Sequence, residues 1–229
     1  MAVAVGQLAA EAPGAPTQGI DDRRLGIIGA GKFGTTLARA AVAAGYNVAI
    51  SGSGPAESIA LTIDVLAPVA HAATNDEVVA HADVIILAVP THRFRELRPN
   101  LFAGKVLIDA TNYWPPVDGD DRELAGAPEG TSTIVQQHFP SARLVKSLNQ
   151  LGYHQLEENQ RPHGAPERIA IGAAGDDQLA VRTVMRFLDH LGFDPVDAGP
   201  LKNGIALEPD GSPIATTYSA EQLAKRISR

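Results

Sequence analysis

The chain has 229 residues, of which 45% are hydrophobic and 20% are charged, and its 19 Lys and Arg against 26 Asp and Glu give a formal net charge of −7. This composition is typical of a globular protein with a full core, and the negative charge makes nucleic acids and anionic membranes poor partners. The sequence has no cysteine, which excludes disulfides, cysteine-ligated metals and thiol nucleophiles.

The N-terminal residues are rich in Ala, Gly and Pro, lack a basic region and include Glu11, so they do not resemble a secretion signal. Because residues 1–23 also lack hydrophobic periodicity, we expect them to form a disordered N-terminal arm. No apolar run approaches the ~20 residues that a membrane span requires. We therefore expect a cytoplasmic enzyme or binding protein with no membrane and no nucleic-acid partner.

From Leu25 onward, short apolar runs alternate with segments that have helical spacing. The apolar runs predict strands, and the segments between them predict helices. The expected strands are residues 25–28, 46–50, 83–89 and 105–109, and the expected helices are residues 33–44, 56–66, 75–80 and 94–97. Because strands and helices alternate closely, we expect an α/β protein with a Rossmann-type doubly wound parallel sheet and helices on both faces.

A loop rich in Pro and Gly, residues 112–130, precedes the second part of the chain. Beyond it, the pattern predicts three more helices and three more strands. The helices are residues 131–139, 177–191 and 219–228, and the strands are residues 142–147, 169–172 and 193–196. The sequence therefore predicts a Rossmann dinucleotide-binding domain over residues 24–135 and a smaller C-terminal α/β part over residues 136–229.

The first expected strand runs into a glycine-rich turn that opens a helix. Its residues fit the pattern G-x-G-x-x-G and are Gly29, Ala30, Gly31, Lys32, Phe33 and Gly34. The first glycine permits the tight exit from the strand, the second lets a diphosphate approach the backbone, and the third lets the helix pack close to the sheet. Amides at the start of the helix then face the anion. A turn in this context predicts a dinucleotide-binding site.

The end of the second strand indicates which dinucleotide binds. NAD-type sites place an Asp or Glu about 20 residues after the first glycine, where it binds the ribose 2′-hydroxyl. This chain has Ser51, Gly52 and Ser53 there and no acid before Glu57. Because a carboxylate would repel a 2′-phosphate and hydroxyls or amides can bind one, the loop favours NADP over NAD. The loop has no Arg, so the charge of the phosphate must be met by Lys32 or by a residue from elsewhere.

Four segments, residues 27–34, 83–90, 145–149 and 191–201, are shared with a known family. In them the chain resembles the coenzyme F420-dependent NADP oxidoreductases. The first two segments also occur in pyrroline-carboxylate reductases and hydroxyacid dehydrogenases, and the last is the most specific. The resemblance implies hydride transfer between the nicotinamide of NADP and the deazaflavin of coenzyme F420, in a homodimeric enzyme.

Residues at the ends of the later strands complete the expected cofactor site. In the family, the turn after the strand at 83–89 lies beside the nicotinamide half of NADP, which implies this role for Val89 and Pro90. His92 follows where the ribose and phosphates could pass. Asn112 ends the next strand, where ligands of open α/β sheets gather, and could bind the carboxamide or only cap its turn.

The same resemblance implies an acceptor site on the opposite wall. Ser147, Leu148 and Asn149 correspond to the residues that hold the deazaflavin, and Leu201 would contact the ring or the partner subunit. Archaeal members have a His where Asn149 stands, so a proton-handling role at that position would be absent here. Hydride transfer between stacked rings depends on holding the reacting carbons about 3–3.5 Å apart, so we expect no catalytic side chain.

The chain also departs from the family, which leaves the acceptor open. Gly52 replaces the usual Arg after the second strand, and the tail is short and polar. An anionic acceptor tail would need positive charge, for which the candidates are Lys146, Arg161, Arg168 and Lys202. The alternatives are an NADPH-dependent reductase of a flavin, quinone or imine, and a dinucleotide-sensing protein without catalysis. No two of the seven histidines form H-x-x-x-H, so no metal site is expected.

Overall fold

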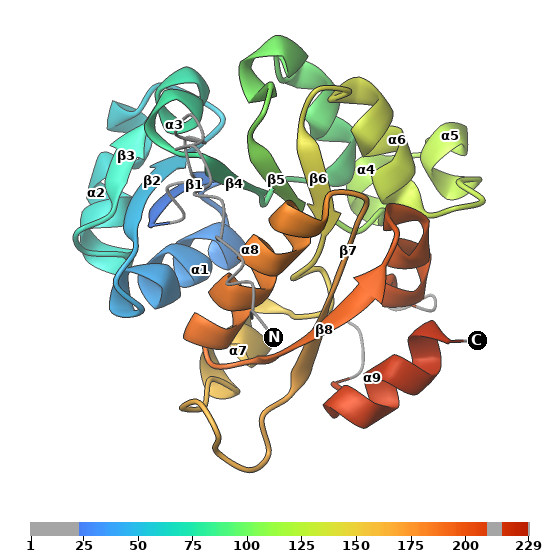
Figure 1. Ribbon diagram of the computed structural model, residues 1–229. Helices are drawn as coiled ribbons and strands as arrows, with labels where there is room; N and C mark the ends of the chain where they lie inside the picture. Colours follow the sequence, from blue (N-terminus) through green and yellow to red (C-terminus); the bar gives the residue numbers. More distant parts are fainter. Residues whose placement is uncertain (1–22, 210–216, 229) are drawn as a thin grey trace, which may run out of the picture.

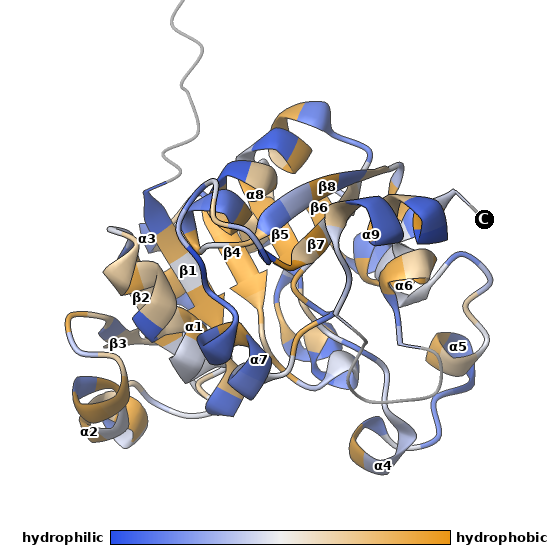
Figure 2. Ribbon diagram, turned by 90° about the horizontal axis from the view of Figure 1, so that it is seen from below, coloured by the Kyte–Doolittle hydropathy of each residue, from blue (hydrophilic) through white to orange (hydrophobic). Residues whose placement is uncertain are grey.

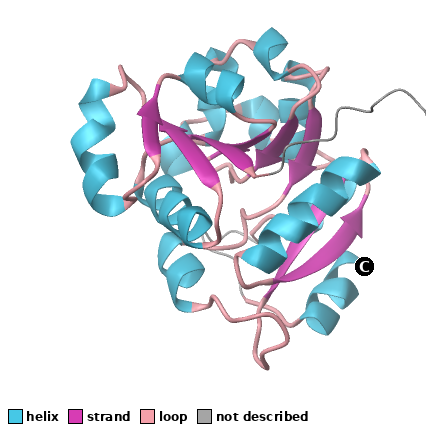
Figure 3. Cartoon of the chain, turned by 60° about the vertical axis from the view of Figure 1, so that its left-hand side comes forward, coloured by secondary structure: helices cyan, strands magenta, loops and turns pink. Residues whose placement is uncertain are grey.

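The computed structural model describes residues 23–209 and 217–228. In this part of the chain an eight-stranded sheet runs through the molecule in the order β3-β2-β1-β4-β5-β6-β7-β8 (Figure 1), and helices cover both of its faces (Figure 3). The α/β Rossmann-type fold expected from the sequence is confirmed. The arm expected over residues 1–23 lies outside the described residues, apart from Arg23.

The strands and helices follow one another along the chain largely as expected. The strands are β1 (Arg24–Ile28), β2 (Asn47–Ser51), β3 (His71–Ala73), β4 (Val84–Leu87), β5 (Val106–Asp109), β6 (Arg143–Lys146), β7 (Ala170–Gly175) and β8 (Asp194–Gly199). The α-helices are α1 (Lys32–Ala43), α2 (Glu57–Leu66), α3 (Asn75–His81), α4 (Pro115–Asp118), α5 (Arg122–Ala125), α6 (Thr131–His138), α7 (Tyr153–Glu158), α8 (Gln178–His190) and α9 (Ala220–Ile227). The 3₁₀ helices are η1 (Thr91–Glu96), η2 (Pro99–Phe102) and η3 (Leu201–Leu207). The short elements β3, α4, α5, α7, η2 and η3 were not expected, because they are too brief to show a periodic pattern.

The sheet is mixed rather than wholly parallel, which corrects the expectation from the sequence. Strands β1 to β6 are parallel and have the order 3-2-1-4-5-6 of a dinucleotide-binding fold. Strand β7 pairs antiparallel with β6, and β8 pairs parallel with β7. The connection from β6 to β7 carries α7, which packs against α1, and the chain then enters β7 from the end of the sheet where β6 finishes.

Two apolar layers hold the sheet between its helices. Alternate residues of each central strand point to opposite faces, so Ile27 and Ile86 pack into the layer under α1 and α8, whereas Ile28 and Leu87 pack into the layer under α3 and α6. All four side chains are buried. Figure 2 shows the hydrophobic strands at the centre of the molecule. Burial of both faces explains why these strands read as continuous apolar runs.

The last helix, α9, covers the outer strands β7 and β8. Its N-cap is Ser219, whose hydroxyl accepts a hydrogen bond from the backbone amide of Gln222 (3.3 Å). Leu223 is fully buried in a small third cluster with Leu207. Helix α9 therefore covers the strands at the end of the sheet opposite to β3.

Candidate dinucleotide-binding site

A cleft of about 380 Å³ lies where β1, β2 and β4 end. It collects residues that the sequence analysis selected from three separate segments. The expected cofactor residues that line it are Gly29, Ala30, Gly31, Gly52, Ser53, Val89 and Pro90. These segments meet because the three strands are parallel neighbours, so their carboxyl ends lie at one edge of the sheet.

The three glycines of the turn have different surroundings. Gly29 has a φ of 121°, and a Cβ there would lie 2.2 Å from the carbonyl oxygen of Ala88. A Cβ on Gly34 would lie 1.8 Å from the carbonyl oxygen of Gly29. A Cβ on Gly31 would meet no heavy atom within 4 Å. The chain itself thus requires Gly29 and Gly34, whereas the space beside Gly31 is open to a ligand.

The start of α1 is suited to an anion. Gly31 is its N-cap, no side chain accepts a hydrogen bond from its first turn, and that turn has no acidic residue. In contrast, the first turns of α8 and α9 are capped by the side chains of Asp177 and Ser219. The first amides of a helix have no partner within the helix and carry the positive end of its dipole. The arrangement at Gly31 therefore fits the diphosphate of a dinucleotide.

Lys32 and Phe33 point elsewhere. The Lys32 ammonium lies 5.4 Å from the centre of the Tyr153 ring, a cation–π contact with α7. Phe33 is half-buried and packs against the core. Neither residue is among the described residues that line the cleft, so their assignment to the cofactor stays a prediction.

At the end of β2, two of the three residues expected to bind the cofactor have structural roles instead. Ser51 is fully buried, and its hydroxyl donates a hydrogen bond to Oδ1 of Asn75 (2.6 Å). A Cβ on Gly52 would lie 2.8 Å from Cγ2 of Ile59, so this position has no room for a side chain. Ser53 is exposed and lines the cleft.

The sequence analysis did not select three polar residues of the cleft, Asn75, Arg93 and Glu96. Asn75 begins α3, and Arg93 lies in η1, three residues after Pro90. A signal for Arg93 was present, because loops at the carboxyl ends of parallel strands gather at the ligand site.

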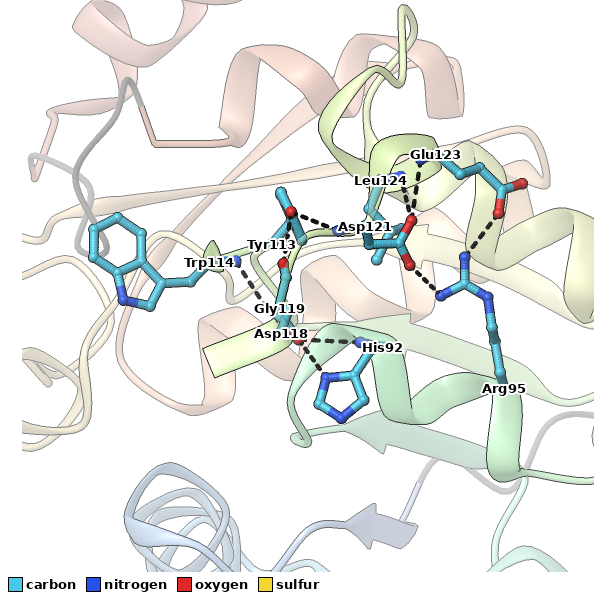
Figure 4. A network of polar contacts seen from close by, with 9 residues as sticks. All are labelled: His92, Arg95, Tyr113, Trp114, Asp118, Gly119, Asp121, Glu123 and Leu124. Carbon is cyan, nitrogen blue, oxygen red and sulfur yellow. Dashed lines mark hydrogen bonds and ion pairs between the residues drawn. The ribbon is translucent and has the colours of Figure 1, made fainter. Parts of the chain in front are cut away.

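His92 is held by a buried carboxylate (Figure 4). Its Nδ1 lies 2.9 Å from Oδ1 of Asp118, and its backbone amide donates to the same oxygen (3.1 Å). The Asp118 side chain is 1% exposed and also accepts a hydrogen bond from the amide of Trp114 (2.8 Å). His92 thereby ties the loop after β4 to the loop after β5 and does not line the cleft.

The segment after β5 is held to η1 at a second point. Arg95 pairs with Asp121 (2.9 Å) and Glu123 (2.8 Å), as Figure 4 shows. The backbone amide of Leu124 and the Arg95 guanidinium hold the pKa of Asp121 below its ordinary value. Two contacts from η1 therefore fix the segment that follows Asn112.

Asn112 lines a second hollow of about 540 Å³ and is not among the described residues that line the first cleft. Its amide group pairs with Asn149: Nδ2 of Asn112 donates to the Asn149 carbonyl oxygen (2.6 Å), and Nδ2 of Asn149 donates to Oδ1 of Asn112 (3.0 Å). Tyr113, Trp114 and Glu208 also line this hollow. The structure thus brings the ends of β5 and β6 together.

The other residues of the expected acceptor wall face the interior. Ser147 is fully buried and its hydroxyl donates to the carbonyl oxygen of Gly172 (2.7 Å). Leu148 is fully buried, with a φ of 65°, and Leu201 is 3% exposed within the core. None of the three lines the second hollow, and their assignment to the acceptor stays a prediction.

Two of the four basic side chains considered as partners of an anionic acceptor tail form internal ion pairs instead. Lys146 is fully buried, where it donates to the carbonyl oxygen of Thr111 (2.6 Å) and pairs with Asp109 (3.4 Å). The Arg168 side chain is 2% exposed and pairs with Asp189 and Asp194. Both expectations are corrected, because a buried and paired cation cannot meet a ligand from solution. Arg161 and Lys202 are exposed.

Within residues 23–209 and 217–228, no group of three or more His, Asp or Glu residues is placed to hold a metal ion. No helix in these ranges has the length and apolar character needed to cross a membrane.

Comparison with known proteins confirms the resemblance found in the sequence. The family model of coenzyme F420-dependent NADP oxidoreductases matches residues 24–113, which include the whole cleft. The metalloreductase STEAP3 of Rattus norvegicus is 25% identical over 187 residues, which are 81% of this chain. The chain spans only 36% of the length of STEAP3.

Two solved structures share the fold over most of their length. A hypothetical protein from Sinorhizobium meliloti has a TM-score of 0.73 and 27% identity, and the match covers 86% of this chain and 95% of that one. A candidate F420-dependent NADP reductase from Arthrobacter has a TM-score of 0.67 and 24% identity, and the match covers 81% of this chain and 87% of that one.

Proposed function

We propose that this protein, whose residues 24–113 match the family model of coenzyme F420-dependent NADP oxidoreductases, is an enzyme that binds NADP and exchanges a hydride with a deazaflavin of the F420 type. The observation that carries the proposal is the open cradle at Gly31, at the uncapped start of α1 and inside the cleft. We further propose that residues 24–135 bind the dinucleotide and that residues 136–229 serve acceptor binding and dimerisation.

In this proposal the backbone around Gly31 binds the diphosphate, and the turn at Val89 and Pro90 lies against the nicotinamide half. Bound NADPH supplies the hydride. The chain contributes position rather than acid–base chemistry: the rigid turn aims the dinucleotide along the sheet edge, and the closely packed strand ends exclude water from one side of it.

The second hollow is the proposed place for the acceptor ring. Tyr113 and Trp114 offer aromatic faces on which a planar ring can stack. Asn112, which lines the hollow, is held in place by its two hydrogen bonds with the buried Asn149. The exposed Lys202 is the proposed contact for an anionic tail.

A second candidate function follows from the burial of Lys146 and Arg168. The acceptor side offers an anionic tail less positive charge than the sequence suggested, and Glu208 adds a carboxylate to the hollow. This favours a less anionic acceptor, such as a flavin, a quinone or an imine, reduced by NADPH.

The test is a binding titration followed by turnover. Purified protein is titrated with NADPH and NADH by calorimetry, and the loss of nicotinamide absorbance is then followed with F420, with FMN, with a quinone and with a cyclic imine. Turnover with F420 alone supports the first candidate, and turnover with another acceptor supports the second. Binding of NADPH without turnover favours a dinucleotide sensor. Failure to bind either coenzyme refutes the proposal, and light scattering of the same sample tests for the homodimer.

A further inference from the structure

The loop after β2 leaves one question open: which cation meets the 2′-phosphate of NADP. This phosphate carries a charge of about −1.5 to −2 at neutral pH, and its binding sites in proteins depend on charge-assisted hydrogen bonds, most often from Arg. Between Ser51 and Ala56 the chain has no basic residue. The cation must come from another element.

Arg93 is the basic residue among the described residues that line the cleft. Ser53 lines the same cleft from the loop after β2, whereas Arg93 comes from η1 after β4. Strand β1 lies between β2 and β4, so the two loops flank the turn that begins at Gly29. The adenosine half of a dinucleotide whose diphosphate lies at Gly31 would have Ser53 and Arg93 within one cleft.

The Arg93 side chain is already held in place. Its Nε and Nη2 donate to Oε2 of Glu96 (3.1 and 2.7 Å), and its side chain is 36% exposed. Within the described residues Nη1 makes no hydrogen bond, so a donor is left for a ligand. A guanidinium held by one carboxylate oxygen keeps its planar fork oriented at the cleft wall.

The other nearby cations are directed elsewhere. Lys32 lies over the Tyr153 ring, and Arg98 pairs with Asp76 outside the cleft. Arg95 is held by two carboxylates of the loop after β5. Asn75, whose Oδ1 is occupied by the Ser51 hydroxyl, adds only a neutral amide donor to the cleft.

Resting on the proposed function, we propose that Arg93 recognises the 2′-phosphate and makes the protein specific for NADP over NAD, in place of the cation that the loop after β2 lacks. Ser53 supplies a hydroxyl to the same phosphate. Glu96 orients the guanidinium while the site is free and shares it when the phosphate binds.

The experiment compares Arg93→Gln and Arg93→Lys with the wild type, using NADPH, NADH, 2′,5′-ADP and 5′-AMP as ligands in calorimetric titrations. We expect R93Q to bind NADPH and 2′,5′-ADP about ten- to a hundredfold more weakly, while the affinity for NADH and 5′-AMP stays as in the wild type. R93K should keep part of the preference, because it retains the charge and loses the planar fork.

Arg98→Gln is the matched control, because it removes an exposed arginine outside the cleft and should change no affinity. R93Q should melt at the wild-type temperature, since an exposed ion pair contributes little to stability. The NADPH affinity of the wild type should also fall more steeply with added salt than that of R93Q.

Three results would overturn the inference. An equal loss of NADPH and NADH affinity in R93Q would mean that Arg93 stacks on the adenine, which both coenzymes share. An unchanged preference in R93Q would place the phosphate elsewhere while leaving the proposed function intact. If the wild type binds neither coenzyme, the proposed function and the inference both fail.

Discussion

The glycine turn allows a test that separates folding from binding, because two of its glycines differ in what surrounds them. In Gly31→Ala the new Cβ meets no atom within 4 Å, and the φ of −76° suits any residue. Alanine is a poorer N-cap than glycine, so we expect the variant to lose no more than about 1 kcal/mol of stability. The methyl group would occupy the space through which a diphosphate approaches the backbone, so NADPH affinity should fall at least about tenfold, or about 1.4 kcal/mol.

Gly34→Ala should mainly lower stability, whereas Gly31→Ala should mainly lower NADPH affinity. Its Cβ would lie 1.8 Å from the carbonyl oxygen of Gly29, a backbone atom that cannot move without opening the turn. Overpacking of this kind costs about 1–3 kcal/mol, and for a chain of this length each kcal/mol lowers the melting temperature by about 2–4 °C. We therefore expect G34A to melt about 2–12 °C below the wild type and to lose NADPH binding as a consequence.

Melting curves by circular dichroism and NADPH titrations on the same preparations measure both effects. The reasoning is refuted if G31A binds NADPH as tightly as the wild type, since the open space at Gly31 would then not be a ligand's path. It also fails if G34A is as stable as the wild type.

Two further predictions concern buried and half-buried charges. Lys146→Met leaves the Asp109 carboxylate buried without its cation, so denaturant unfolding should show that the free energy of unfolding falls by about 3–5 kcal/mol. Lys225→Met removes one partner of an exposed helix ion pair and should leave the free energy of unfolding nearly unchanged. Equal effects of the two substitutions would contradict the burial argument. The hydrogen bond from His163 and the Arg168 guanidinium lower the pKa of Asp189 from 3.8, so its ionised form stabilises the folded state at pH values above 3.8 and this contribution is lost as the pH falls through the lowered pKa. Asp189→Asn should therefore be less stable than the wild type near neutral pH, and the difference should shrink on acidification below pH 3.8; a difference independent of pH would argue against this linkage.

Much of the dinucleotide cleft could be predicted because its determinants are local in the chain. The turn at Gly29 follows an apolar strand and opens a helix, and each step is visible within a few residues. The prediction of NADP rather than NAD also rested on a local feature, the absence of an acidic residue directly after β2. The expected residues Gly31 and Ser53 consequently line the cleft.

The acceptor side was less predictable because the direction of a side chain at a strand end depends on what covers it. Ser147 and Leu201 lie in segments shared with the family, yet their side chains face the interior. The antiparallel course of β7 was missed for the same reason: its apolar sequence suits a parallel or an antiparallel strand, and only the route of the chain through α7 decides between them.

The sequence alone therefore determined the order of strands and helices, the glycine turn and the NADP-type loop, because hydrophobic period and glycine conformation act over a few neighbouring residues. Only the tertiary structure decided that Lys146 is buried beside Asp109 and that Arg93 shares a cleft with Ser53. These pairings join residues about 40 positions apart in the chain, and such distant residues meet only when strands pair and helices pack on them.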